Sequence, residues 1–471
     1  MPVRRSVVRR LSGPDAWFLY SERPGWPMHV GALCIVDATG VPDWGFARLR
    51  ELLVERLPRV PEFAMKVKEV PLGLDLPVLV PDPDFKLDHH LHRLGLPSPG
   101  GPRELGELVG DLAEVPLDRG RPLWDMWLIE GLEHDRSALF VKTHHALVDG
   151  VSGAGLAEIL ADLEPNPAKG QSPSPLPSTS ESVPSDLELL ARGAASALVK
   201  PIHTARWAAD FARRTVANTR TAQRLGGRTV FNQAPIVPFN GVLGPMRRFA
   251  FTSMPLASVK QVKDAHQVKV NDVVLALAAG AVRSWLLGRD ALPDQSVVAS
   301  VPMSIRAEAD LERGNQLVTL YASLATDKDD PVERLHAIAA GMRSAKEIGN
   351  AVKAKEIRRL SETIMPGLAN LGWRAYQQAN AEAMGFQPSN LIVSNVPGAP
   401  VPIYVAGAQV VAAHPVPPLV IGQGLNITLM SYQDSIDVGF ICDREKIDDP
   451  WELVDGMHAS LDELLAAEPR S

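Results

Sequence analysis

Residues 140–163 read FVKTHHALVDGVSGAGLAEILADL, and this stretch decides the fold of the N-terminal half. A short apolar run ends in two adjacent histidines, His144 and His145, and Asp149 and Gly150 follow where the run stops. Apolar residues at helical spacing come next, namely Leu156, Ile159, Leu160 and Leu163. This order predicts a buried strand, a tight turn and a helix start. Because successive side chains of a strand point to opposite faces, only one histidine can face a site, and the other is expected to be structural.

A histidine held between a strand end and a helix start is suited to general base catalysis. An unperturbed pKa of about 6.5 leaves imidazole mostly neutral at pH 7, and a positioned base is worth roughly 10²- to 10⁴-fold in rate. The sequence has no Gly-x-Ser-x-Gly elbow, and neither Cys34 nor Cys442 stands in a nucleophile motif. Direct attack by a bound alcohol or amine is therefore the simpler chemistry.

Two other interpretations of the histidine pair stay open at this point. Adjacent histidines are often packing residues with satisfied hydrogen bonds. A metal site is the second, because the stretch LDHHLHRL adds Asp88, His89, His90 and His92. Neither cluster has the Cys-x₂-Cys or His-Glu-x-x-His spacing that fixes a metal geometry, so we expect no metal.

Composition narrows the class of protein. The chain has 471 residues, enough for two cores, with 48 basic and 55 acidic residues and a formal net charge of -7. That balance does not indicate a nucleic-acid binder. Two cysteines exclude a disulfide framework, and no signal peptide is recognisable, so a cytoplasmic location is expected. The apolar window 273–287 is interrupted by Arg283 and shorter than the about 20 residues that span a bilayer, so membrane association would be peripheral.

The chain divides at a segment rich in Pro and Ser, residues 164–186, which we interpret as a linker between residues 1–163 and 187–471. Both halves mix strands and helices, so the fold class is α/β with mixed sheets, in two domains with a cleft between them. The predicted strands are 29–38, 138–147, 296–305, 390–396 and a hairpin over 425–443 that turns near Gln433 and Asp434. The predicted helices are 46–58, 187–225, 271–287, 331–348, 353–379 and a final one after Pro450.

These motifs together resemble a known family. HHALVDG (144–150) resembles the His-His-x-x-x-Asp-Gly signature of the CoA-dependent acyltransferase superfamily. Stretches elsewhere are similar to the bacterial wax ester synthase/diacylglycerol acyltransferase family within it: RRLSGPDAWFLYSERPGWPMHVGAL (9–33), PLDRGRPLWDMWLIEGL (116–132), VNDVVLALAAGAVRSWL (270–286), VPMSIR (301–306), SNVPGAP (394–400) and GQGLNITLMSY (422–432). The resemblance covers about residues 9–465 and implies two chloramphenicol-acetyltransferase-like domains, with the active site in a channel between them.

The resemblance also implies roles for the signature residues. His145 would take the proton from an acceptor hydroxyl, which then attacks the acyl-CoA thioester without an acyl-enzyme. His144 and Asp149 would support it, with Gly150 in the turn, and Asp149 would pair with an arginine across the fold, for which Arg306 is the candidate.

Residues of the second half receive weaker assignments. Asn271 would orient the site or donate to the oxyanion, and Asp272 beside it is expected to cap the following helix. The resemblance places a second group near the cleft: Ser394, Asn395 and Pro397 would shape a loop, and Gln423 and Asn426 would line it. LDHHLHRL corresponds to a structural segment of the family.

A basic region follows the linker. Residues 191–228 contain eight Lys or Arg residues and one acid, Asp210, with Leu198, Trp207 and Phe211 as apolar residues. Basic amphipathic helices of this kind bind anionic membranes, and a helix packed on the second domain with a solvated basic face is the alternative.

The leading hypothesis is thus an O-acyltransferase that moves a long-chain acyl group from acyl-CoA to diacylglycerol, and potentially to fatty alcohol, at a membrane or lipid-droplet surface. It needs no cofactor beyond its acyl-CoA substrate. One alternative is a polyketide-associated or condensation-type acyltransferase that takes its acyl group from a carrier protein. Another is a non-catalytic lipid-droplet-binding protein.

Overall fold

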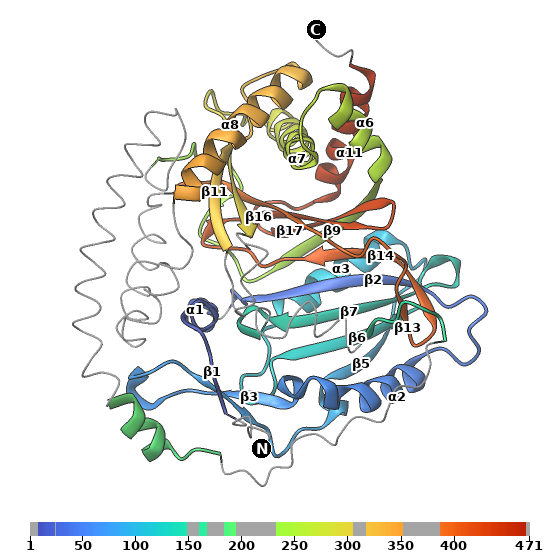
Figure 1. The fold of residues 1–471 in the computed structure, drawn as a ribbon. Helices are drawn as coiled ribbons and strands as arrows, with labels where there is room; N and C mark the ends of the chain where they lie inside the picture. The colour runs from blue at the N-terminus through green and yellow to red at the C-terminus, as the bar shows by residue number, and fades with distance from the viewer. Residues whose placement is uncertain are drawn as a thin grey trace.

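Two mixed β-sheets lie one above the other in the computed structural model (Figure 1). The structure describes residues 8–23, 25–147, 160–166, 183–194, 232–304, 317–351 and 387–467. This architecture is the mixed α/β fold that the sequence predicts.

The lower sheet in Figure 1 is built around the histidine strand. Its order is β13-β14-β2-β7-β6-β5, and only β5 and β6 run parallel. The strands are β2 (His29–Asp37), β5 (Leu91–Gly95), β6 (Trp124–Glu130), β7 (Ser137–His144), β13 (Tyr404–Val405) and β14 (Ala408–Val416). The predicted strand at 29–38 is confirmed, and the one predicted at 138–147 is confirmed as far as His144, because both contain buried apolar residues. Residues 145–147, predicted as its end, form a helical turn.

Strand β14 belongs to the second half of the chain but completes the sheet of the first. It pairs antiparallel with β2 and lies against β17 (Ser435–Asp443) of the other sheet. Gly439 on β17 permits this close approach, since a Cβ there would lie 1.8 Å from the carbonyl oxygen of Pro415. The two halves of the sequence therefore share a sheet, and the proposed boundaries at 163 and 187 do not separate the strands of one sheet from the other.

The upper sheet has the order β11-β10-β12-β16-β17-β9. Its further strands are β9 (Arg247–Pro255), β10 (Val298–Ser304), β11 (Leu317–Ser323), β12 (Leu391–Val396) and β16 (Leu425–Tyr432). The predicted hairpin is confirmed, because β16 and β17 pair from Leu425 with Cys442 to Tyr432 with Ser435. Four helices cover the outer face of this sheet (Figure 1): α6 (Leu256–Ala265), α7 (Val270–Leu287), α8 (Pro331–Ala351) and α11 (Trp451–Ala466).

Helix α7 is the core helix of this layer. By length and composition it is the candidate membrane span among the described residues, yet 72% of the window is buried inside the protein. It packs against α6, α8, α11 and β12, which explains its apolar composition without a membrane. The predicted N-cap, Asp272, instead lies at the third position of α7, and Lys269 is the N-cap. The Asp272 carboxylate accepts a hydrogen bond from the backbone N–H of Lys269 at 3.0 Å, so it stabilises the helix start from within the first turn.

Helix α3 (Pro102–Glu114) lies between the two sheets and contacts both β9 and β2. Gly106 allows this, because a Cβ there would lie 2.6 Å from the carbonyl oxygen of Phe249. At the C-terminal end of α3, the buried Lys142 donates to the carbonyls of Leu112 and Val115 at 2.9 and 2.8 Å. This contact ties α3 to β7 two residues before the histidine pair.

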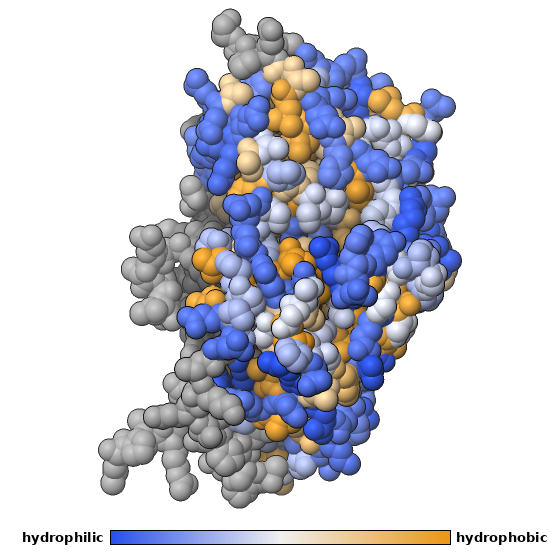
Figure 2. All heavy atoms as spheres, turned by 90° about the vertical axis from the view of Figure 1, so that its right-hand side faces the viewer, coloured by the Kyte–Doolittle hydropathy of each residue, from blue (hydrophilic) through white to orange (hydrophobic). Residues whose placement is uncertain are grey.

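The remaining elements lie beside the two sheets. They are helices α1 (Gly13–Ser21) and α2 (Phe46–Arg56), a sheet of β1 (Arg9–Arg10), β4 (Val78–Pro81) and β3 (Met65–Lys68), the pair β8 (Asn240–Gly241) and β15 (Gly422–Gln423), and the 3₁₀ turns Leu57–Arg59, Pro61–Ala64, Pro71–Gly73, Leu87–His89 and Glu133–Asp135. The predicted helix 353–379 and most of 187–225 lie outside the described residues. On the face drawn in Figure 2, hydrophobic side chains are scattered among hydrophilic ones.

Candidate active site

The histidine pair lies where β7 ends. His144 is the last residue of the strand and pairs with His29 of β2, and His145 begins the helical turn that follows. The side chain of His144 is 1% exposed, whereas His145 is only half-buried. The two rings therefore occupy different environments, although His145 lies past the end of the strand and not on its opposite face. His145 is the more exposed of the two, and its Nδ1 is buried without a hydrogen-bond partner among the described residues.

Both ring nitrogens of His144 are occupied. Its Nδ1 accepts a hydrogen bond from the backbone N–H of Ala146 at 3.1 Å, and its Nε2 lies 3.0 Å from Oε2 of Glu22. An acceptor Nδ1 carries no proton, so the ring proton is on Nε2, which donates to the carboxylate. His144 is thus a structural histidine in a single tautomer.

His145 is held from two sides. Its backbone N–H donates to the carbonyl of Met28 at 2.9 Å, and the ring of Phe18 stacks on its imidazole with 3.7 Å between centroids. Burial lowers the pKa of His145 to about 4, its own backbone carbonyl opposes that change and His144 adds to it. The imidazole is therefore neutral at pH 7, the state in which it can accept a proton.

Glu22 joins the histidine turn to α1. Its Oε2 accepts from Nε2 of His144 and from the backbone N–H of Met28 at 3.1 Å, and its Oε1 accepts from Nε of Arg119 at 3.3 Å. Burial alone would raise the pKa of this carboxyl, but the hydrogen bonds from His144 and from the Met28 N–H and the charge of Arg119 lower it below its ordinary value. Glu22 is therefore ionised at every working pH.

The segment from Glu22 to Met28 is fastened by the second half of the chain. The indole N–H of Trp26 donates to the carbonyl of Leu419 at 2.8 Å. The buried Arg247 donates through Nη2 to the carbonyl of Gly25 at 2.8 Å. Both halves of the chain thus meet beside the histidine turn, and His145 lies at the place where they join.

Two predicted cleft residues are buried, and one of them, Asn426, holds the loop that reaches Trp26. Asn426 donates through Nδ2 to the carbonyl of Pro418 at 2.8 Å. Gln423 donates to Oγ of Ser389 at 2.8 Å, and its buried Oε1 has no partner among the described residues. Both side chains are buried. That they line the cleft for the substrate stays a prediction.

The other predicted residues of the second half lie on two elements. Ser394 and Asn395 are half-buried on β12, and Pro397 is exposed just after it. Asn271 is half-buried in the first turn of α7. The structure describes no contact between any of these residues and the histidine pair, so their assignments remain predictions.

Three predicted residues cannot be placed. Asp149, Gly150 and Arg306 lie outside the described residues. The ion pair between Asp149 and Arg306 therefore also stays a prediction.

The LDHHLHRL side chains have structural partners. Nδ1 of the buried His90 lies 2.8 Å from the carbonyl oxygen of Trp124, and the two rings stack with 4.8 Å between centroids. Asp88 pairs with Arg50 at 2.8 Å on the surface. The structural interpretation of this stretch is confirmed.

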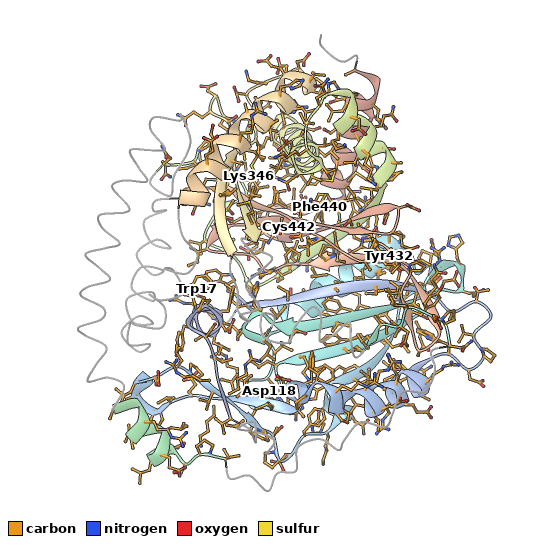
Figure 3. The ribbon with its side chains drawn as sticks, viewed as in Figure 1. Trp17, Asp118, Lys346, Tyr432, Phe440 and Cys442 are labelled. Carbon is orange, nitrogen blue, oxygen red and sulfur yellow. The ribbon has the colours of Figure 1, made fainter. Side chains whose placement is uncertain are left out.

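A pocket of about 490 Å³ lies at the opposite end of β2, away from the histidines. Asp37, Arg48, Tyr404 and Gln409 are among its lining residues. Tyr432 packs with Val405 and Val410, which adjoin the lining residues Tyr404 and Gln409 in sequence. In Figure 3 Tyr432 lies on the right and Trp17 of α1 on the left. The pocket therefore belongs to the far edge of the sheet and not to the histidine turn.

Sequence reasoning did not single out Phe18, Glu22, Trp26, Arg119 or Arg247. The first three fall within the 9–33 stretch that carries part of the family resemblance, which was the available signal. Their contacts with the histidine turn and the second half join residues far apart in sequence, so no local pattern indicates them.

The chain is similar to known proteins over nearly its whole length. Residues 11–274 match the model of the wax ester synthase/diacylglycerol acyltransferase catalytic domain, and residues 313–465 match the model of the WS/DGAT C-terminal domain. A relative from Mycobacterium tuberculosis (strain CDC 1551 / Oshkosh), named "Putative diacyglycerol O-acyltransferase MT1809", is 37% identical over 466 residues, which cover 98% of this chain and 91% of the relative.

Solved structures share the fold. The wax ester synthase/diacylglycerol acyltransferase from Marinobacter aquaeolei VT8 is 28% identical with a TM-score of 0.70, and the match covers 97% of this chain and 98% of that one. The first condensation domain of the calcium-dependent antibiotic synthetase is 15% identical with a TM-score of 0.55, covering 99% and 98%. At 15% identity, the match to the condensation domain shows a shared fold and nothing more.

Proposed function

Because this chain belongs to the wax ester synthase/diacylglycerol acyltransferase family, we propose that it transfers a long-chain acyl group from acyl-CoA to diacylglycerol, with fatty alcohol as a further acceptor. The observation that carries the proposal is the neutral, half-buried imidazole of His145 at the junction of the two halves. The name of the Mycobacterium tuberculosis relative supports diacylglycerol as the acceptor.

The reaction would need no covalent enzyme intermediate. The His145 imidazole takes the proton of the acceptor hydroxyl as its oxygen attacks the thioester carbonyl carbon. The tetrahedral intermediate collapses by breaking the carbon–sulfur bond, and the departing CoA thiolate takes the proton from the imidazolium. The products are the ester and free CoA, and His145 returns to its neutral state.

Burial has two effects on this step. It keeps His145 unprotonated at neutral pH, so the base is always available. It also makes the imidazole a weaker base, which the exclusion of water and the fixed geometry of the turn must offset. The stacked Phe18 and the Met28 carbonyl supply that geometry.

The test is turnover of purified protein with a long-chain acyl-CoA and diacylglycerol and without any carrier protein, followed by CoA release and by the acylated product. A parallel reaction with fatty alcohol ranks the two acceptors. Triacylglycerol formation supports the proposal. Activity only with an acyl group on a carrier protein favours the condensation-type alternative, and no turnover of any donor favours a non-catalytic lipid-binding role.

We further propose that the enzyme acts in the cytoplasm, bound peripherally to the inner membrane face or to lipid droplets. Its substrates and product are water-insoluble or amphipathic, and the basic region 191–228 carries the charge that attracts anionic lipid. Vesicles that contain anionic lipid should retain the protein on flotation, and Arg213→Gln with Arg214→Gln should weaken retention. Equal flotation of both proteins would remove this assignment.

A further inference from the structure

The last turn of helix α1 contacts the histidine pair at two points, through Phe18 and through Glu22. Glu22 caps the C-terminus of α1, with its backbone N–H donating to the carbonyl of Phe18. Residues four apart lie on one face of a helix, so this last turn presents the Phe18 ring to His145 and the Glu22 carboxylate to His144.

The carboxylate makes bonds that define one state of His144. Its side chain is 8% exposed, and a single oxygen, Oε2, accepts from Nε2 of His144 and from the N–H of Met28. A proton on Nδ1 of His144 would face the N–H of Ala146 at 3.1 Å. Two donors cannot face each other there, so this contact and the carboxylate favour the same tautomer, with the proton on Nε2.

These contacts surround the backbone of His145. Ala146, which donates to the His144 ring, follows it directly, and Met28, whose carbonyl accepts from the His145 N–H, donates its own N–H to Glu22. One carboxylate oxygen thus orders both peptide strands that hold His145.

We propose that Glu22 is a positioning residue for the acyl transfer: it fixes His144 as the Nε2–H tautomer and thereby holds His145 at the orientation needed to deprotonate the acceptor. The inference rests on the proposed function for its kinetic part. Its structural part, the tautomer of His144, is measurable in the resting protein.

Two substitutions separate the geometry of Glu22 from its charge. Glu22→Ala removes the acceptor from both Nε2 of His144 and the N–H of Met28. Glu22→Gln keeps one oxygen, which can accept from both Nε2 of His144 and the N–H of Met28. Its NH₂ group then faces the donor of Arg119, whose side chain is 41% exposed and can move away. Glu69→Ala is the matched control, since Glu69 pairs with the same arginine at 3.8 Å but is 67% exposed.

The first measurement is kinetic. Glu22→Ala should lower kcat about 10- to 100-fold with little change in KM, because misplacement of a catalytic group costs rate rather than ground-state binding. Glu22→Gln should restore most of the wild-type kcat, and Glu69→Ala should match wild type. Equal losses in Glu22→Gln and Glu22→Ala, or wild-type kcat in Glu22→Ala, would overturn the proposal.

The second measurement needs no turnover. Long-range ¹H–¹⁵N spectra of histidine-labelled protein, with the His144 signal assigned from a His144→Gln sample, report which ring nitrogen carries the proton. Wild type and Glu22→Gln should show Nε2–H alone, and Glu22→Ala a mixture of tautomers. A single Nε2–H tautomer in Glu22→Ala would overturn the positioning claim, even if wild type transfers no acyl group and the proposed function itself fails.

Discussion

The ring of Phe18 stacks on the imidazole of His145, with 3.7 Å between centroids and 13° between planes. The stack covers one face of the base while the ring as a whole stays half-buried. Burial is also the largest cause of the lowered pKa of His145. One aromatic contact therefore both orients the base and keeps it neutral.

Replacing Phe18 should change the pH dependence of the reaction. In wild type, kcat/KM should stay level from pH 8 to about 5 and fall as His145 is protonated near its pKa of about 4. Phe18→Ala admits water to the ring, so the acid limb should move up toward the unperturbed pKa of about 6.5. Trp17→Ala is the control, because Trp17 contacts Phe18 edge-on and does not stack on His145. An unchanged acid limb in Phe18→Ala would show that the stack does not control protonation.

A second prediction concerns the join between the halves of the chain. Trp26→Phe removes the N–H that binds the Leu419 carbonyl and should lower kcat/KM about five- to tenfold, the equivalent of roughly 1 kcal/mol for one hydrogen bond. Trp44→Phe is the matched control. The Trp44 indole donates to the Val405 carbonyl at 3.0 Å, and Val405 lies on β13, the edge strand of the lower sheet. Both variants should lose similar stability, but only Trp26→Phe should lose turnover. Similar kinetic losses in both would argue for a general effect of destabilisation.

The contact between the sheets makes stability depend on pH. Burial lowers the pKa of His414 to about 4, against the opposing charge of Asp437. The unfolded chain takes up a proton on this residue near pH 6.5 while the folded chain does not, so stability is complete above about pH 6.5 and is lost as pH falls toward 4. Tm should therefore fall by several degrees across this window. The slope of Tm against pH should be shallower in His414→Gln, and equal slopes would contradict the assignment.

Much of the fold was readable from local sequence. The strands at β2, β7, β12 and β16–β17 consist of short runs whose apolar residues are buried, and such runs are distinct in sequence. The turn of the hairpin lies at Gln433 and Asp434, as predicted.

Strand β14 and helix α3 were not predicted, for two physical reasons. β14 is stabilised by pairing with β2, about 380 residues earlier in the chain, and no local pattern encodes that partner. α3 packs between two sheets through Gly106 and Gly110, residues that favour close approach but weaken a helical pattern.

The site was predictable only in part. Strand alternation predicts that the two histidines differ, and the family resemblance chooses between them. In the structure they differ because His144 ends β7 and His145 begins the helical turn that follows. Glu22 could not be found this way, because it lies 122 residues from His144 and only its contact with His144 in the fold indicates a role. An acidic residue after a short helix carries no such information by itself.

The central claim is that His145 is the base for acyl transfer, and turnover by His145→Ala tests it most directly. With a long-chain acyl-CoA and diacylglycerol, CoA release should fall at least about 100-fold relative to wild type, while Tm and acyl-CoA binding are retained. CoA release by His145→Ala within a few-fold of the wild-type rate would contradict the account.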